Sequence, residues 1–266
     1  MNENIKLYNG DCLDIMKTFE SEIIDLTVTS PPYDNLRTYD GSLNDWSFGK
    51  FQEIAKELFR ITKQCGVVVW IVGDATIKGS ETGTSFKQAL YFKEIGFNLH
   101  DTMIYIKDVC PFPDTNRYYQ NFEYMFVFSK GKPKTTNLLK DRVNKSFGRK
   151  VSGTSRNKDG STSPKECLDN EIKEYGIRFN SWLVSDGKRQ GLHPAPFPER
   201  LANDHIVSWS NKGNTVFDPF TGSGTTGKMS VLNNREFIGI ERVKNYFDIA
   251  EKRIKEASEK KEDVIF

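Results

Sequence analysis

The sequence lacks the features that mark membrane, secreted and metal-dependent proteins. No apolar run reaches the about 18 residues of a membrane span, and the opening segment MNENIKLYNGD has no charged start followed by an apolar stretch, so we expect a cytoplasmic protein. Four cysteines without a C-x-x-C pair and three histidines without zinc spacing predict reduced thiols and no metal site. The absence of an H-x-E and P-C-x-x-C set argues against a zinc-dependent base deaminase.

Charge is nearly balanced over the whole chain but is unevenly distributed. The net charge is +2, yet Lys130 to Gln190 holds 15 Lys and Arg against 7 Asp and Glu, which leaves 23 basic and 29 acidic residues elsewhere. A basic segment within a mildly acidic chain indicates either a surface that faces a polyanion or a solvated loop region, and charge alone leaves both readings open.

Short apolar runs alternate with amphipathic stretches, which is typical of an α/β fold. Strands are predicted over 23–29, 67–74, 101–107 and 122–130, and helices over 51–62 and 87–97. The segment 131–190 is rich in Gly, Ser and Lys and is predicted to be loop. We therefore expect a doubly wound, mostly parallel sheet from 1–130 and 191–258, with a basic insert over 131–190 and a tail over 259–266.

The turn FDPFTGSGTTGKM, residues 217–229, satisfies two nucleotide-binding patterns. Its glycines match G-x-G-x-x-G from Gly222 onward, and Glu241 at the end of the next strand is placed to bind a ribose hydroxyl. The same turn matches G-x-x-x-x-G-K, but Met229 stands where a phosphate loop needs Ser or Thr to hold Mg²⁺. The phosphate-loop interpretation is therefore the weaker of the two.

Asp218, which precedes these glycines, narrows the choice of ligand. A carboxylate at this point would repel a pyrophosphate bound at the helix N-terminus, which argues against a dinucleotide. The same carboxylate suits a cationic ligand that carries a ribose, an amine and a sulfonium but no phosphate, such as S-adenosylmethionine. A P-loop-like nucleotide-binding ATPase, an NAD-dependent oxidoreductase and a turn without ligand are the alternatives at this point.

The segment TSPPY, residues 29–33, ends an apolar strand in a turn that two prolines make stiff, because proline fixes φ and lacks an N–H. With both turns in view, the chain resembles the DNA amino-methyltransferases. TSPPY resembles their catalytic motif, [Asp/Asn/Ser]-Pro-Pro-[Tyr/Phe/Trp], and FDPFTGSGTT, residues 217–226, resembles their cofactor motif. The catalytic motif precedes the cofactor motif, which is the permuted order of the beta group. The resemblance implies a Rossmann-like methyltransferase fold with circularly permuted motifs.

Four further segments support the resemblance, namely LYNGDCLDIM (7–16), NFEYMFVFSKGKP (121–133), LHPAPFPERL (192–201) and FIGIER (237–242). The resemblance implies the catalytic residues Ser30, Pro31, Pro32 and Tyr33. It implies S-adenosylmethionine as cofactor, bound by Asp11, Asp218, Pro219, Phe220, Gly222, Ser223, Gly224, Thr225 and Glu241. The insert at 131–190 corresponds to the family's target-recognition region.

Methylation of a base amine would explain why the Pro-Pro turn is stiff. A base amine is a poor nucleophile, and we expect Ser30 Oγ and the Pro31 carbonyl to accept its two N–H groups, which localises the lone pair. Tyr33 is expected to stack on the extruded base. In the family that the chain resembles, serine in the first motif position leans towards cytosine N4 and aspartate towards adenine N6, and both amines stay open here. Cytosine C5 methylation needs a Pro-Cys step, which the sequence lacks.

Double-stranded DNA is the partner that the resemblance implies, with a separately encoded restriction endonuclease wherever such a pair exists. We interpret 34–46 as a loop that closes over the base. The candidate DNA-binding residues are Arg37 and Tyr39 in this loop and Lys140, Arg142, Lys145, Arg149, Lys150, Arg156 and Lys158 in the insert. A homodimer, a catalytically silent nucleic-acid reader, and RNA or a protein glutamine as substrate also remain open.

Overall fold

The computed structural model describes residues 4–32, 46–108, 115–165, 170–185 and 198–262. Contacts between Cα atoms divide the chain into two compact units. The larger unit comprises Met1–Asn137 and Asn180–Phe266, and the smaller unit is Leu138–Phe179. The insert boundaries expected from composition, 131–190, enclose the smaller unit on both sides.

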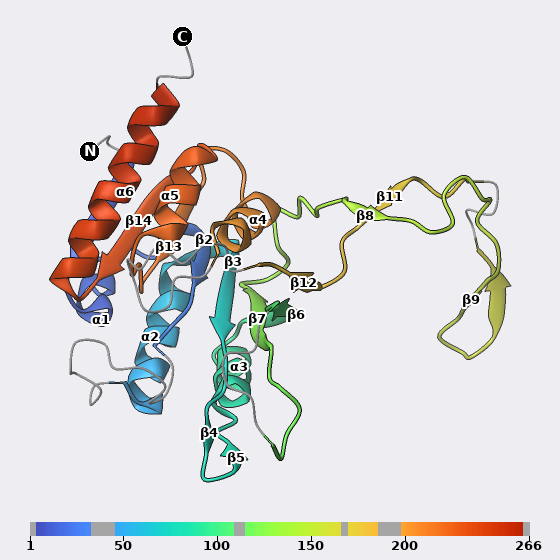
Figure 1. Ribbon diagram of the computed structural model, residues 1–266, viewed down its shortest axis with the longest axis horizontal. Helices are drawn as coiled ribbons and strands as arrows, with labels where there is room; N and C mark the ends of the chain where they lie inside the picture. The colour runs from blue at the N-terminus through green and yellow to red at the C-terminus, as the bar shows by residue number, and fades with distance from the viewer. Residues whose placement is uncertain (1–3, 33–45, 109–114, 166–169, 186–197, 263–266) are drawn as a thin grey trace. The chain divides into compact units, whose positions relative to one another are not determined.

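Within the described residues of the larger unit, eight strands form one sheet in the order β1-β14-β13-β2-β3-β7-β6-β12 (Figure 1). Their bounds are β1 Ile5–Asn9, β14 Glu236–Glu241, β13 Thr215–Asp218, β2 Ile24–Thr29, β3 Thr62–Val72, β7 Phe122–Ser129, β6 Asn98–Ile106 and β12 Ser181–Leu183. Neighbours from β1 to β3 are parallel, β7 runs antiparallel to β3 and β6, and β12 is parallel to β6. The predicted doubly wound, mostly parallel α/β class is confirmed.

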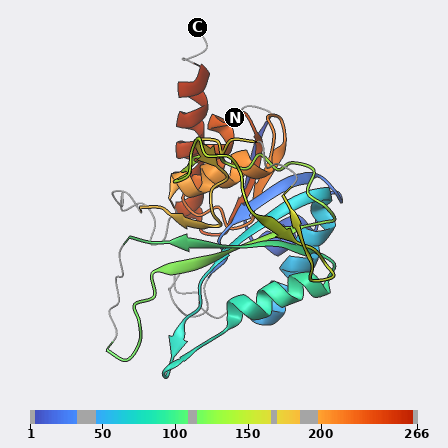
Figure 2. The same ribbon diagram turned by 90° about the vertical axis from the view of Figure 1, so that its right-hand side faces the viewer.

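Helices cover both faces of this sheet. Their bounds are α1 Cys12–Met16, α2 Phe48–Ile61, α3 Thr84–Glu94, α4 Glu199–Trp209, α5 Thr225–Leu232 and α6 Lys244–Glu262. α2 contacts both α1 and α3, and these three share one apolar cluster, whereas α5 contacts α4 and α6 (Figure 2). A second cluster joins α5 and α6 to β1 and β14. Because both faces are covered, the central strands are apolar almost throughout.

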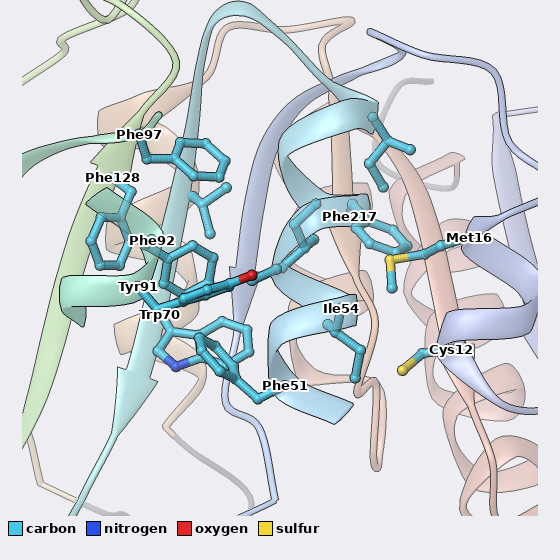
Figure 3. Close-up of a cluster of buried hydrophobic side chains, with 14 of the residues drawn as sticks. Cys12, Met16, Phe51, Ile54, Trp70, Tyr91, Phe92, Phe97, Phe128 and Phe217 are labelled. Carbon is cyan, nitrogen blue, oxygen red and sulfur yellow. The ribbon is translucent and has the colours of Figure 1, made fainter. Parts of the chain in front are cut away.

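The larger apolar cluster holds β3 firmly in the sheet (Figure 3). Successive side chains alternate between faces, so Val68, Trp70 and Val72 all point into this cluster. Trp70 is fully buried, and its indole N–H donates to Gln88 Oε1 at 2.8 Å. The ring of Phe92 packs against Phe128 with centroids 4.6 Å apart. A rigid core therefore supports the strand next to the one that carries the Pro-Pro turn.

Element boundaries differ from the sequence predictions in ways that local chemistry explains. α2 begins three residues early, at Phe48, because the Ser47 hydroxyl caps it by accepting the Lys50 N–H at 3.2 Å. β3 begins at Thr62, directly after α2, instead of at residue 67. The tail expected from residue 259 is helical as far as Glu262, since α6 continues through it. Among the residues that the structure describes, no helix combines the length and apolarity needed to cross a bilayer.

Short strands occur where the sequence predicted loop. In the described part of the smaller unit, β8 Arg142–Val143 pairs with β11 Tyr175–Gly176, and β9 Thr154–Arg156 pairs with β10 Thr162–Pro164. In the larger unit, β4 Thr76–Ile77 and β5 Ser80–Glu81 form a hairpin between the predicted strand 67–74 and the predicted helix 87–97, where no element was predicted. Strands of two or three residues are too short to produce a readable alternation, which is why composition predicted loop.

Candidate active site

The strand order brings the two sequence motifs to one edge of the sheet. β13 and β2 are parallel neighbours, so the turns that follow them leave the sheet at the same edge. From β13 the chain crosses through α5 to β14 on one side, and from β2 it crosses through α2 to β3 on the other. Ligands of doubly wound sheets bind at such a reversal, outside the carboxyl ends of the strands. We call this edge, at the carboxyl ends of β13 and β2, the catalytic edge.

The Pro-Pro turn begins directly after β2. Ser30 and Pro32 are half-buried and Pro31 is buried, whereas Tyr33 lies outside the described residues. The preceding Thr29 is fully buried, and its Oγ1 donates to Asp218 Oδ1 at 2.7 Å. One hydrogen bond therefore links the strand that leads into the Pro-Pro turn to the carboxylate that opens the glycine turn.

Asp218 is buried, with a side chain that points into the turn. Its Oδ1 also accepts the Phe220 N–H at 3.0 Å, and the residue is 1% exposed. Burial raises the pKa of this carboxyl to about 7, against the opposing hydrogen bonds from Thr29, Phe220 and Thr226, and the charge of Glu241 raises it further. The sequence argument placed Asp218 at the amino-acid end of a ligand, whereas the observed bonds join the two turns.

Glu241, at the end of β14, closes the glycine turn from the other side. Its Oε2 accepts the Gly222 N–H and its Oε1 accepts the Val243 N–H, both at 2.8 Å. Burial raises the pKa of this carboxyl, although these backbone hydrogen bonds oppose the shift. Gly224 has φ +83°, and a Cβ there would lie 2.9 Å from Ala250 Cα, so the turn requires glycine at this position.

A charge cluster that sequence reasoning missed supports the glycine turn. Arg253 of α6 donates through Nη1 to the Ser223 carbonyl at 2.5 Å and to its hydroxyl at 2.9 Å. Arg253 Nη2 and Lys228 Nζ both reach Glu199 Oε1, at 2.9 and 2.7 Å. Lys228 is the lysine of the phosphate-loop pattern, and here its charge is directed at a carboxylate. Only the folded chain brings these residues together, so spacing carried no signal for Arg253 or Glu199.

Asp11 follows β1 and lines an open pocket, and β14, which ends in Glu241, separates β1 from the strand that carries the glycine turn. The pocket has a volume of about 350 Å³ and is lined by Asp11, Leu13, Asp14, Lys50 and Glu53. Asp11 caps α1 by accepting the Leu13 N–H at 2.9 Å, and its Oδ2 lies 2.7 Å from Lys50 Nζ. Burial opposes ionisation, but the Lys50 hydrogen bond and charge and the Leu13 N–H together lower the pKa of Asp11. Lys50 is a further residue that the sequence did not indicate.

Asp11 and Glu241 are held next to one another by backbone contacts. β1 pairs with β14 so that Asn9 lies opposite Glu241, and the Gly10 N–H donates to the Glu241 carbonyl at 3.1 Å. The Asn9 side chain donates to the same carbonyl at 2.8 Å. The backbones of Asp11 and Glu241 thus lie at the carboxyl ends of adjacent strands, where their carboxylates could receive the amine of a flat ring and the hydroxyls of an attached sugar.

The candidate DNA-binding residues have different surroundings. The Arg142 guanidinium lies over the Phe179 ring at 4.6 Å and donates to the Ile177 carbonyl at 2.9 Å. Its contacts therefore help to hold the smaller unit together. Lys150 takes part in a backbone bridge with Glu171. Exposed positions are occupied by Lys140, Lys145, Arg149, Lys150, Arg156 and Lys158. Arg37 and Tyr39 lie outside the described residues.

Two motif turns at one edge of a doubly wound sheet are the arrangement that the resemblance to the DNA amino-methyltransferases implies, and comparison with known proteins agrees. The chain belongs to the DNA methylase family of N6 and N4 methyltransferases, whose profile matches residues 24–252. It is 58% identical over 264 residues to the orphan methyltransferase M.BamHII of Bacillus amyloliquefaciens, covering 96% of this chain and 92% of the relative. It is 26% identical to the DNA adenine methyltransferase YhdJ of Escherichia coli, covering 97% of this chain and 85% of the relative. The predicted membership of the DNA amino-methyltransferases is confirmed.

Solved structures share the fold. The cytosine-N4-specific PvuII DNA methyltransferase matches with a TM-score of 0.70 and 21% identity, covering 98% of this chain and 93% of that one. A complex of M1.HpyAVI with S-adenosylmethionine matches with a TM-score of 0.61 and 24% identity, covering 94% and 99% of the two chains. Family membership decides against the ATPase and oxidoreductase alternatives, whose patterns the glycine turn also satisfied.

Proposed function

We propose that this chain transfers the methyl group of S-adenosylmethionine to cytosine N4 of a base extruded from double-stranded DNA. The observation that carries the proposal is the 2.7 Å hydrogen bond between Thr29 and Asp218, which joins the Pro-Pro turn to the glycine turn. A methyl donor held at one turn is then next to an amine held at the other. Adenine N6 is the alternative acceptor, because the relatives named above include an enzyme for each base.

In this proposal, the Pro-Pro turn activates the base amine. Ser30 Oγ and the Pro31 carbonyl accept its two N–H groups and draw the nitrogen towards a tetrahedral shape, which localises the lone pair. Neither Pro31 nor Pro32 carries a backbone N–H, and Pro31 is buried, so the turn has few ways to relax. Tyr33 stacks on the base. The N–CH₃ bond forms as the S–CH₃ bond breaks, and the extra proton on nitrogen leaves to solvent.

The same proposal gives the cofactor an orientation along the edge. Asp11 accepts the adenine amine and Glu241 accepts the ribose hydroxyls, since these carboxylates end adjacent strands. Gly222, Ser223 and Gly224 let the backbone approach the ligand closely, and Thr225 begins α5. Asp218, Pro219 and Phe220 form the wall between donor and base. Phe220 is braced by edge-to-face contacts with Trp46 at 5.6 Å and Trp70 at 6.2 Å.

Target recognition is assigned to the smaller unit, Leu138–Phe179. Its exposed Lys145, Arg149 and Arg156 are suited to phosphates and to guanine edges in the major groove. Arg142 supports the unit instead, because its guanidinium is stacked on Phe179 and hydrogen-bonded to the backbone.

The test combines modified-base sequencing of plasmid DNA from a host that expresses the protein with two variants. We expect N4-methylcytosine at one recognition sequence in the wild type. Ser30→Ala should bind S-adenosylhomocysteine normally but lose methyl transfer by about 10²- to 10³-fold, the usual effect of removing one transition-state hydrogen bond. Glu241→Ala should instead weaken cofactor binding. N6-methyladenine would move the proposal to adenine, and native transfer by Ser30→Ala would refute the assigned chemistry.

A further inference from the structure

Two protrusions extend beyond the catalytic edge, one from the end of β3 and one from the strands on the side of β3 away from β2. The β4–β5 hairpin follows β3, and residues 107–121 join β6 to β7, the pair of strands beyond β3. β6 is parallel to β3 in this sheet, because β7 runs antiparallel to both, so its carboxyl end also meets the catalytic edge. Both views show the hairpin and the described end of the loop extending in the same direction (Figures 1 and 2).

Arg117 connects these two protrusions. Its guanidinium donates through Nη2 to the Gly79 carbonyl at the tip of the hairpin, and Nη1 lies 3.9 Å from Glu81 Oε1. The base of the hairpin is fixed in turn, since the Thr82 N–H donates to the Ala75 carbonyl at 2.9 Å. A hairpin anchored to the core through β3 therefore supports the loop that carries Arg117.

The two residues after Arg117 are unusually exposed for their size. Tyr118 is 101% exposed and Tyr119 is 58% exposed. On the hairpin that Arg117 contacts, Ile77 is 45% exposed and is followed by the exposed Lys78. Single exposed apolar residues are common on protein surfaces, but here two neighbouring aromatic rings share the protrusions with two cations, at the edge where the base must arrive. Aromatic rings beside basic side chains are the combination that stacks on nucleic-acid bases.

We propose that Tyr118 and Tyr119 enter the DNA base stack next to the extruded base, with Arg117 as the positioning residue that holds them there. This inference rests on the proposed function, because it needs an extruded base at the Pro-Pro turn. The hairpin starts one strand from β2, and Tyr118 and Tyr119 lead into β7, which is two strands from β2. At about 4.8 Å per strand, the start of β7 is roughly 10 Å from β2, which is within the groove width of about 12 Å.

Extrusion of a base from the duplex leaves a gap that the Tyr118 and Tyr119 rings could fill. A base that leaves the duplex gives up its stacking and leaves a gap, and side chains that fill gaps or wedge between base steps recover part of that loss. Charge is balanced over the described residues of the two protrusions. Glu81 lies 3.9 Å from Arg117 and Glu123 is paired with Lys107 at 2.5 Å, while Lys78 and Asp108 are exposed, so the inference rests on the aromatic rings.

The test uses Tyr118→Ala on two short duplexes that carry the recognition sequence found by modified-base sequencing. In one the target base is paired correctly, and in the other it is mispaired and so already easy to extrude. We expect the variant to lose about 5- to 100-fold in kcat/KM on the paired duplex, the range for one base–aromatic stack. On the mispaired duplex it should approach the wild-type rate. Tyr118→Phe should keep full activity, because the ring and not the hydroxyl stacks.

The control is Leu232→Ala, which removes an exposed apolar side chain at the carboxyl end of α5, away from the catalytic edge. Unchanged rates for Tyr118→Ala and Tyr119→Ala on both duplexes would overturn the inference. An equal loss on both duplexes would also overturn it, because that points to general damage or to a plain binding contact. Failure of the proposed function looks different, since the wild type would then methylate neither duplex.

Discussion

Replacement of Asp218 by asparagine gives a sharp test of the arrangement that joins the two turns. The carboxyl is 1% exposed and has a pKa raised to about 7, whereas an aspartate in the unfolded chain has a pKa of 3.8. Asparagine has nearly the same shape, and its carbonyl oxygen can accept the same Thr29 and Phe220 donors. The Thr226 hydroxyl, which also reaches the carboxyl, can rotate to accept from the new amide N–H.

The sign of the pH effect follows from the direction of this shift. Between the two pKa values the folded protein holds a proton on Asp218 that the unfolded chain releases, so the free energy of unfolding falls as pH rises from about 4 to about 7. Three pKa units at 1.36 kcal/mol each give a cost of up to about 4 kcal/mol above neutral pH. An asparagine side chain does not titrate, so the Asp218→Asn variant escapes this cost.

The measurement is urea denaturation of both proteins, followed by tryptophan fluorescence at about pH 4.5 and about pH 8. We expect Asp218→Asn to gain several kcal/mol relative to the wild type between the two conditions. Asp218→Ala is the control: it also escapes the titration cost but leaves the Thr29 and Phe220 donors unpaired, so it should be less stable than Asp218→Asn at both pH values by about 1–3 kcal/mol per lost acceptor. A difference between the wild type and Asp218→Asn that stays constant with pH would refute a raised pKa at this carboxyl.

Two further predictions concern the pocket and the glycine turn. Lys50→Met removes the cation that lowers the pKa of Asp11, so this carboxyl should take up a proton at a higher pH than in the wild type. The affinity for S-adenosylhomocysteine, measured by calorimetry at decreasing pH, should therefore begin to fall at a higher pH. The same pH profile in both proteins would contradict a role for Lys50. Gly224→Ala should cost at least about 1–2 kcal/mol in thermal unfolding, because it combines φ +83° with a contact of 2.9 Å. Gly213→Ala, which has φ +78° and no atom within 4 Å, separates backbone strain from crowding.

Much of the fold is readable from the sequence because local patterns and burial agree. The apolar runs that became β2, β3 and β7 were predicted from residue type alone, and both motifs lie at the end of a strand, as their turn residues indicated. A parallel order for neighbouring strands then requires the two turns to share an edge. Family resemblance added what periodicity could not, namely the chemistry expected at that edge.

The remaining features depend on contacts between distant parts of the chain. Arg253 and Glu199 meet at the glycine turn although 54 positions separate them, and no local pattern marks either residue. The sequence also could not predict the orientation of the Asp218 side chain. An aspartate at the end of a strand gives the same sequence pattern whether its carboxylate faces a ligand or a threonine on the next strand. β12 pairs through only three residues, which is too few for an alternating signal.

The pairing of β1 with β14 has a practical consequence. Ile5 begins β1 on the side of the sheet opposite the catalytic edge, and α6 runs back from β14 towards that same side, so the described ends of the chain lie on one side of the sheet (Figures 1 and 2). Fluorophores or tethers attached at the exposed positions Asn4 or Lys260 will therefore lie away from the catalytic edge. Enzyme immobilised through either position should keep its activity.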